Sequence, residues 1–397
     1  KMKEVSSWLK SGKSFLEACS TGNLDLVKGL LDVNRDFLSQ RDPKLHQTPL
    51  FFACESGNVA LVQYLVDYHE CDVKVEDYMV NNPFMYACSS GSLDLVKYLL
   101  EVHHVDIHHS GIDCKLPILM ACKSGNIDLV KYMINEYDID VSKKNVLGES
   151  TTKYACMSGN IQLVEFLHKN YGVKVIEQNF LQQTPLFDVC KLGCFDMVKY
   201  LMEQHQANGD EKDRWDQTPV FLACASGNVG LVHYMIEKHQ VNIHEKSKNG
   251  QTPFFYACKS RNVKMVRYLI EHRLCDAMIK DNDDETPLFP ACKTTENVDI
   301  ALYLIQDLHL NVNTKNRFGE TPLLKACFSG SKEMVQLLLS YPVNLYDVTL
   351  TGGSAVDVAV RYNYPDILRL LLQKDPNLVH FQKNSLSLIH ILLKDID

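Results

Sequence analysis

Apolar and polar positions form two short helical patterns that follow each other closely along the chain. In residues 47–66, Thr48 and Pro49 precede an apolar run that ends near Ser56, and Gly57 follows. Thr is favoured just before a helix, Pro is tolerated at the first helical position, and Gly readily takes the left-handed backbone that ends a helix. Apolar residues then recur along one helix face at Leu61, Val62, Leu65 and Val66. The pattern predicts two short helices, followed by an extended stretch from residue 71 to 78.

The same pair of patterns recurs at a nearly constant interval. Seven consecutive cysteine-to-cysteine steps, from Cys54 to Cys292, are 34 residues long, and the flanking steps are 35. The full series is Cys19, Cys54, Cys88, Cys122, Cys156, Cys190, Cys224, Cys258, Cys292 and Cys327. Thr-Pro returns at Thr184-Pro185, Thr218-Pro219, Thr252-Pro253, Thr286-Pro287 and Thr321-Pro322, and the turn glycine at Gly22, Gly91, Gly125, Gly159, Gly193, Gly227 and Gly330. Such a period predicts one supersecondary unit stacked many times.

This repeat closely resembles the ankyrin repeat, whose signature is Thr-Pro-Leu-His-x-Ala, a turn glycine and a Leu-Val-x-x-Leu-Leu helix. About eleven copies run from Lys13 to Leu372. The resemblance implies an all-α solenoid of stacked helix-turn-helix units with β-turn fingers, which binds other macromolecules and has no catalysis of its own. We expect a capping segment at 1–12, the repeat array at 13–375 and a capping helix at 376–397, where apolar residues run from Leu386 to Leu393.

The chain departs from the ankyrin pattern at two positions. In place of the histidine after Thr-Pro-Leu it has Phe51, Met85, Leu119, Lys153, Phe187, Phe221, Phe255, Phe289 and Leu324. We therefore expect apolar packing instead of the family's Thr–His hydrogen bond. An extra residue follows the second helix at His69, His103, Tyr137, Tyr171, His205 and His239. This insertion explains the longer period, and we expect these residues to cap carbonyl groups at helix ends.

Three repeats and two finger tips are expected to be distorted. The fifth repeat has Ser150-Thr151-Thr152 in place of Thr-Pro-Leu, which puts polar groups in the core. The eighth has Arg261 at the glycine position, and the ninth has Pro290 inside its first helix. At the tips, Val80 and Cys114 replace glycine, and we expect a different turn there because a β-branched residue resists positive φ. Alternatively, a solenoid tolerates such departures from the repeat pattern because packing against its neighbours stabilises each repeat.

Charge and cysteine usage narrow the class of partner. The net charge is −8, and a nucleic acid or an anionic membrane would favour a basic stripe, so we expect neither as a partner. No apolar run approaches the length of a membrane span. Equivalent cysteines of neighbouring repeats would lie roughly 8–10 Å apart, whereas a disulfide needs Cα atoms about 4.4–6.8 Å apart. We interpret them as small buried residues and expect a monomer in the reducing cytoplasm. If the chain is instead a secreted effector, we expect it to be delivered into a host cell.

The resemblance also implies where a partner protein or peptide would bind. In ankyrin proteins, finger-tip residues and residues just after Ala-Cys commonly make contacts on the concave face. The candidates are Leu45, Tyr78, Met79, Leu147, Phe180, Leu181, Arg214, Trp215 and Phe318 at the tips, and Lys123, Met157, Lys191 and Lys259 after the cysteines. Large apolar tips beside lysines favour a ligand with apolar anchors and acidic residues. The alternatives are that each tip packs on the next finger and that the lysines form a solvated face.

The sequence contains no strong catalytic or metal-binding motif. His69, Cys71 and His103 lie among several potential ligands, but no pair has zinc-finger or His-x-x-x-His spacing. Ser11-Gly12-Lys13-Ser14 resembles the end of a phosphate loop, yet Ser7 stands where the upstream glycine is needed. We expect no metal, no cofactor and no enzyme activity. The alternative function is a substrate-targeting or adaptor region of a larger protein, such as an effector, a ligase adaptor or an enzyme.

Overall fold

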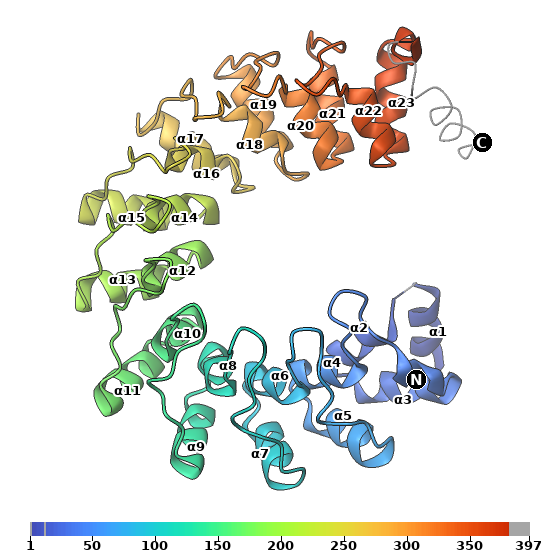
Figure 1. Ribbon diagram of the computed structural model, residues 1–397, viewed down its shortest axis with the longest axis vertical. Coiled ribbons are helices and arrows are strands. Elements are labelled where there is room, and N and C mark those ends of the chain that lie inside the picture. Colours follow the sequence, from blue (N-terminus) through green and yellow to red (C-terminus); the bar gives the residue numbers. More distant parts are fainter. Residues whose placement is uncertain (1, 12, 381–397) are drawn as a thin grey trace. The chain divides into compact units, whose positions relative to one another are not determined.

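The computed structural model describes residues 2–11 and 13–380, in which short helices are joined by turns (Figure 1). The first helices of the repeats are α2 (Phe15–Ser20), α4 (Pro49–Ser56), α6 (Pro83–Ser90), α8 (Pro117–Ser124), α10 (Thr151–Met157), α12 (Pro185–Leu192), α14 (Pro219–Ser226), α16 (Pro253–Ala257), α18 (Leu288–Cys292), α20 (Pro322–Ser329) and α22 (Ala355–Arg361). The second helices are α3 (Leu24–Val33), α5 (Val59–Gln63), α7 (Leu93–Glu101), α9 (Ile127–Tyr137), α11 (Ile161–Tyr171), α13 (Phe195–Gln204), α15 (Val229–His239), α17 (Val263–Glu271), α19 (Val298–Gln306), α21 (Lys332–Leu339) and α23 (Pro365–Lys374). Helix α1 (Met2–Lys10), the short 3₁₀-helices η1 (Arg35–Ser39) and η3 (Pro376–His380), and the π-helix η2 (Tyr64–Tyr68) that continues α5 complete the elements. The described ranges contain no strand, so the predicted all-α class is confirmed.

The chain folds into two compact units. Unit 1 comprises Lys1–Pro185 and Asp196–Ala207, and unit 2 comprises Leu186–Phe195 and Asn208–Asp397. In unit 1, the first helices from α2 to α10 stack side by side, and in unit 2 the same holds for α14 with α16 and for α18, α20 and α22 (Figure 1). Second helices contact the first helix of their own repeat and the second helices of neighbouring repeats. Each repeat therefore buries its apolar faces against the adjacent repeats, as in a solenoid.

The second repeat shows how the sequence forms a helix pair. Helix α4 starts at Pro49, directly after Thr48, and is ended by Gly57, whose φ is 72°. Helix α5 starts after Asn58, whose Oδ1 atom accepts a hydrogen bond from the backbone N–H of Leu61 at 3.0 Å. The predicted helix and its glycine ending are confirmed, and the asparagine cap supplies the start of the second helix.

The asparagine cap also joins neighbouring repeats. Its Nδ2 atom donates to the carbonyl oxygen of the turn glycine in the preceding repeat at 2.8–2.9 Å. These bonds run from Asn58 to Gly22, Asn126 to Gly91, Asn160 to Gly125, Asn228 to Gly193 and Asn262 to Gly227. Two other repeats have Ser92 and Ser331 at this position, and serine carries no amide donor. One asparagine thus satisfies both a helix N-terminus and a carbonyl of the adjacent repeat.

The repeated cysteines lie in the core as free thiols. The phenylalanines that replace the family's histidine are buried as well, namely Phe51, Phe187, Phe221, Phe255 and Phe289. Burial, with a smaller effect from Cys71, raises the pKa of Cys19 to about 12, and burial raises the pKa of Cys54 as well. Thiols with such pKa values are protonated at neutral pH and are poor nucleophiles. The predictions of small buried cysteines and of apolar packing are confirmed.

Finger tips keep one turn geometry even where glycine is missing. The φ angle is 58° at Val80 and 48° at Cys114, so our expectation of a different turn at these two tips is wrong. Around Val80, the Asp77 carboxylate accepts hydrogen bonds from the backbone N–H groups of Met79 and Asn81, both at 2.9 Å. The Val80 N–H donates to the Asp77 carbonyl at 2.9 Å. Together these bonds outweigh the roughly 1–2 kcal/mol that a left-handed residue costs.

The predicted distortions occur in the eighth and ninth repeats but not in the fifth. Helices α16 and α18 have 5 residues each, against 8 in α4, and Arg261 adopts a φ of 62° at the glycine position. In the fifth repeat, the Thr151 hydroxyl donates to the carbonyl of Val141 at 2.8 Å. The Thr152 hydroxyl donates to the carbonyl of Lys174, also at 2.8 Å. The expectation for this repeat is wrong because both buried hydroxyls find backbone acceptors and α10 still forms.

The inserted His and Tyr residues pair with an aromatic ring five positions earlier. His103 Nε2 lies 2.7 Å from the Tyr98 hydroxyl, and His205 Nε2 lies 2.9 Å from the Tyr200 hydroxyl. Edge-to-face ring contacts of the same spacing recur at His69, Tyr137, Tyr171 and His239. Our expectation that these residues cap carbonyl groups is therefore wrong, since aromatic contacts on the second helix hold them instead.

The two ends of the chain differ in what the structure describes. The predicted N-terminal helix forms as α1, which contacts α3 and buries Val5, whereas Leu9 remains exposed. Of the capping helix predicted at 376–397, the structure describes only 376–380, which form η3, and the apolar residues from Leu386 to Leu393 lie outside the described residues.

Candidate binding face

The turns between repeats form fingers whose tips are joined by backbone hydrogen bonds. In eight of the fingers, the first tip residue donates its N–H to the carbonyl of the second tip residue in the preceding finger. In unit 1 these bonds run from Tyr78 to Leu45, Ile112 to Met79, Val146 to Asp113 and Phe180 to Leu147, at 2.8–3.3 Å. In unit 2 they run from Lys248 to Trp215, Asn282 to Asn249, Arg317 to Asp283 and Leu350 to Phe318, at 2.9 Å. Within each unit, the bonds bring the candidate tip residues into one row.

Apolar tips lean on a neighbouring finger and still expose much of their surface. Phe180 is 74% exposed, although its ring covers the backbone of Gly148 so closely that a Cβ atom there would lie 3.0 Å from the ring. Tyr78 is 63% exposed and stacks on His46 with ring centroids 4.9 Å apart. Leu147, Trp215 and Phe318 are each 42% exposed, Arg214 is exposed, and Leu45, Met79 and Leu181 are partly buried. Each tip therefore does pack on a neighbouring finger, as the alternative from the sequence proposed, but its outer surface remains open to solvent.

Unit 2 combines aromatic tips with arginine. The Arg214 guanidinium lies 5.5 Å from the Trp215 ring, and that of Arg317 lies 4.8 Å from the Phe318 ring. Leu350, the next tip in the row, is 79% exposed and is absent from the sequence-based candidates. Its segment, 349–352, repeats the finger pattern and ends in Gly352, whose φ is 80°. The repeated pattern could therefore have identified Leu350 as a tip from the sequence.

Of the candidates that follow the cysteines, Lys123, Met157 and Lys191 lie on first helices, whereas Lys259 lies just after α16. Lys123 and Lys191 are exposed, whereas Met157 and Lys259 are partly buried. The Lys259 ammonium lies 4.5 Å from the centre of the Tyr256 ring. Burial and, next, the charge of Lys293 lower the pKa of Lys259. An anion close to Lys259 would therefore stabilise its charged ammonium.

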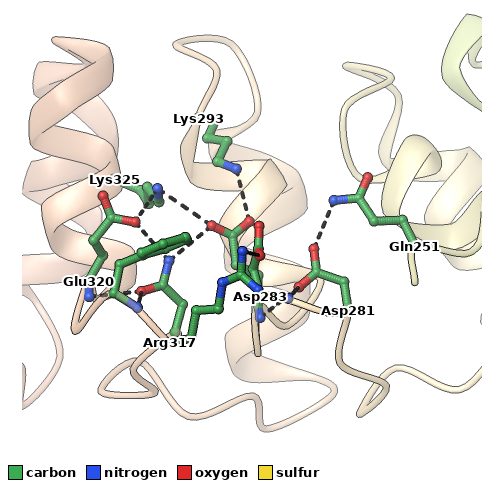
Figure 2. Close-up of polar contacts among 10 residues, drawn as sticks. Gln251, Asp281, Asp283, Lys293, Arg317, Glu320 and Lys325 are labelled. Atoms are coloured by element: carbon green, nitrogen blue, oxygen red, sulfur yellow. Dashed lines mark hydrogen bonds and ion pairs between the residues drawn. The ribbon is translucent and has the colours of Figure 1, made fainter. Parts of the chain in front are cut away.

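A network of ion pairs around the buried carboxylate of Glu285 links fingers and first helices in unit 2 (Figure 2). Glu285, near the base of a finger, accepts a hydrogen bond from Lys293 on the segment after α18 at 2.9 Å and lies 3.5 Å from Lys325 on α20. Asn316 bridges the two glutamates, because its Nδ2 atom donates to Glu285 at 3.2 Å and to Glu320 at 2.7 Å. Lys325 also pairs with Glu320. Two lysines thus face two glutamates, so the charges of Lys293 and Lys325 are already neutralised within the chain.

The charge balance of this network decides the ionisation of its central carboxyl. Burial alone would raise the pKa of Glu285, but the Lys293 hydrogen bond and charge, the Lys325 charge and Asn316 together hold it below its usual value. Lys293 is therefore committed to a partner within the chain.

Fingers and first helices line a hollow in each unit. The hollow in unit 1 measures about 220 Å³ and is lined by Glu55, Asn81, Met85, Tyr86, Ser89, Lys115, Met120 and Lys123. The hollow in unit 2 measures about 310 Å³ and is lined by Lys293, Glu320, Lys325, Phe328 and Ser329. Within residues 2–11 and 13–380, no cluster of three or more His, Cys, Asp or Glu side chains could hold a metal ion. The same part of the chain contains no helix that is long and apolar enough to cross a bilayer.

Comparison with known proteins identifies the repeat. A family model for three copies of the ankyrin repeat matches residues 15–116, 118–214, 152–246, 220–316 and 308–381. The chain belongs to the ankyrin repeat family. A search of curated proteins found no match. Among solved structures, the human ASB11 ankyrin repeat domain is similar, with 21% identity and a TM-score of 0.43 over 56% of this chain and 97% of that domain.

Ankyrin repeats are generally protein-interaction modules, and membership confirms the resemblance drawn from the sequence. The candidate contact residues of this ankyrin array fall into two sets, one in each unit. Unit 1 holds Leu45, Tyr78, Met79, Leu147, Phe180 and Leu181 at the tips with Lys123 and Met157 behind them, and unit 2 holds Arg214, Trp215 and Phe318 with Lys191 and Lys259. We call these tips and the positions that follow the cysteines the binding face.

Proposed function

We propose that the binding face captures a partner protein or peptide and that the chain does not itself catalyse a reaction. The observation that carries this proposal is the row of exposed apolar and aromatic finger tips in each unit, with Phe180 and Tyr78 in unit 1 and Trp215 in unit 2. Monomeric proteins rarely leave neighbouring large apolar groups in water without a use for them. Trp, Tyr and Arg are also the residue types that most often dominate binding energies.

Preorganisation supports the same proposal. The tips are tied to each other by backbone hydrogen bonds, and the repeats are joined by the asparagine caps. A surface held in place before binding loses less conformational entropy when the partner arrives, so more of the contact energy appears as affinity.

The partner that suits this face has apolar anchors and some acidic residues. Lys123 and Lys191 are exposed, and Lys259 lies partly buried without an ion-pair partner in the described residues. The net charge of −8 opposes a nucleic-acid partner. We expect the chain to act as a monomer in a reducing compartment, where its fourteen cysteines stay as thiols.

The double substitution Phe180→Ala with Trp215→Ala tests the placement. Affinity capture from an extract of the source cells, read by mass spectrometry, defines the proteins that the wild-type chain retains. We expect the double variant to lose these proteins, because each substitution removes a large exposed ring from the binding face. The helical circular dichroism should stay unchanged, since neither ring belongs to the core.

A matched control removes exposed side chains elsewhere. Tyr68 and Met278 are 66% and 58% exposed, and both lie beyond second helices rather than at finger tips. The double variant Tyr68→Ala with Met278→Ala should retain the same proteins. Equal capture by the Phe180→Ala, Trp215→Ala variant and the wild type would refute the placement.

A further inference from the structure

The hollow of unit 1 combines adaptable apolar side chains with two charged side chains that form no ion pair in the part of the chain that the structure describes. Met85 and Met120 supply flexible thioethers, and Tyr86 supplies an aromatic wall. Glu55 lies exposed on α4, and Lys123 lies exposed on α8, with the single helix α6 between them. Neither Glu55 nor Lys123 forms an ion pair within the described residues, whereas Lys115 is paired with Asp113 at 3.2 Å.

The hollow of unit 2 provides the contrast. Its lysines, Lys293 and Lys325, both pair with glutamates of the chain. A charged ligand there would have to displace partners that already hold these lysines. In unit 1 the opposite charges stand apart at the two sides of one hollow, where a ligand can pair with both at once.

The size of the unit 1 hollow favours one side chain over a small molecule. Its volume is about 220 Å³, whereas pockets for drug-sized ligands usually measure about 300–1,000 Å³. A single leucine, methionine or phenylalanine side chain would occupy much of this space. Methionine-lined surfaces adapt to several such side chains because the thioether has three rotatable bonds.

The spacing of the two charges defines the length of the segment. Glu55 and Lys123 occupy equivalent positions two repeats apart, so their Cα atoms are separated by roughly 16–20 Å, taking 8–10 Å for each pair of packed helices. An extended peptide advances about 3.3 Å per residue. The same span therefore covers about five or six residues of an extended chain.

We infer that the unit 1 hollow binds an extended peptide segment of a partner protein through three contacts. A central apolar side chain enters the hollow against Met85 and Met120, a basic residue pairs with Glu55, and an acidic residue about five or six positions away pairs with Lys123. This inference rests on the proposed function and names the chemistry of the segment that the face selects.

Selection from a displayed library of random twelve-residue peptides tests the inference. Against the wild-type chain, we expect enrichment of sequences with an apolar residue between a basic and an acidic one. Lys123→Glu should instead enrich peptides with basic residues on both sides, and Glu55→Lys should enrich peptides with acidic residues on both sides. A synthetic wild-type-selected peptide should bind about tenfold more weakly to Lys123→Glu in fluorescence anisotropy, because attraction becomes repulsion.

Control variants carry the same charge changes outside the hollow. Lys199→Glu on α13 and Glu136→Lys on α9 change exposed residues of second helices, and they should select the wild-type pattern. Met120→Ala should weaken the preference for a central apolar residue, and it is used alone because Met85 is buried in the core, where truncation would also destabilise the fold. The inference would be overturned if the Glu55→Lys and Lys123→Glu variants selected peptides with the same charge pattern as the wild type. If those peptides still required Phe180 for binding, the proposed function would stand. A library that yields no wild-type binder would also count against the inference.

Discussion

At the scale of single residues, Glu285 shows how a buried charge is made tolerable. Its carboxylate is almost inaccessible to solvent, and burial by itself opposes ionisation. Lys293, Lys325 and Asn316 supply the compensating hydrogen bonds and charges (Figure 2). Because these residues come from neighbouring repeats, the network also holds those repeats together.

Replacement of Glu285 by glutamine should destabilise unit 2 in a pH-dependent way. The pKa of Glu285 is held below its usual value of 4.5 in the folded chain, so the ionised group adds stability above that pH and loses it as the pH falls through the folded-state pKa. At pH 7, we expect Glu285→Gln to lower the free energy of unfolding by about 1–3 kcal/mol. Urea unfolding followed by circular dichroism between pH 7 and pH 3 measures this difference, which should shrink below pH 4.5.

Glu237→Gln is the matched control for that experiment. Glu237 lies exposed on α15 and has no ion-pair partner in the described residues, so its loss should change stability little at any pH. A Glu285→Gln difference that stays constant from pH 7 to pH 3 would show that the carboxylate charge does not stabilise the fold.

At the scale of elements, the contact between repeats is set by the asparagine at the start of the second helix. Asn160, for example, accepts from the Leu163 N–H at 3.1 Å and donates to the Gly125 carbonyl at 2.8 Å. The third repeat has Ser92 at this position, where the side chain makes no capping hydrogen bond. This repeat therefore lacks a link that several others have.

Ser92→Asn should stabilise unit 1. The asparagine would gain the cap to the Leu95 N–H and a bond to the Gly57 carbonyl, together worth about 1–2 kcal/mol. The free energy of unfolding from urea titrations measures the gain. The reverse change, Asn160→Ser, keeps a hydroxyl for the cap and should cost about 1 kcal/mol through loss of the amide donor. Equal stability of Ser92→Asn and the wild type would indicate that the inter-repeat bond adds nothing.

The sequence predicted the helices well because their signals are local. Pro49 and Gly57 act on their own helix, and the buried cysteine recurs at each period, so α4 could be placed from neighbouring residues alone. Val80 was misjudged because three hydrogen bonds accepted by Asp77 override the preference of one residue. The pairing of Lys293 with Glu285 was missed because it depends on how a finger meets a helix.

At the scale of the whole molecule, the chain is two stacks of repeats, each with its own tryptophan. The sequence contains 2 tryptophans: Trp8 in α1 belongs to unit 1, and Trp215 at a finger tip belongs to unit 2. In a repeat array, stability is a sum of terms for each repeat and its neighbours, so distant repeats are coupled only through those between them. The tryptophans can therefore report separately on the two units.

Leu95→Ala should unfold unit 1 earlier and leave unit 2 unaffected. Leu95 is fully buried in α7, so its truncation should cost about 2–5 kcal/mol. Leu95→Ala is introduced into two single-tryptophan backgrounds. With Trp215→Phe, Trp8 is the only fluorescent reporter, and its urea transition should move to lower urea. With Trp8→Phe, Trp215 is the reporter, and its transition should not move. The reciprocal variant, Leu304→Ala in α19, should move only the Trp215 signal. If Leu95→Ala shifts both signals equally, the neighbour terms at the junction are strong enough to make the array one cooperative unit, and the two-unit description fails for unfolding.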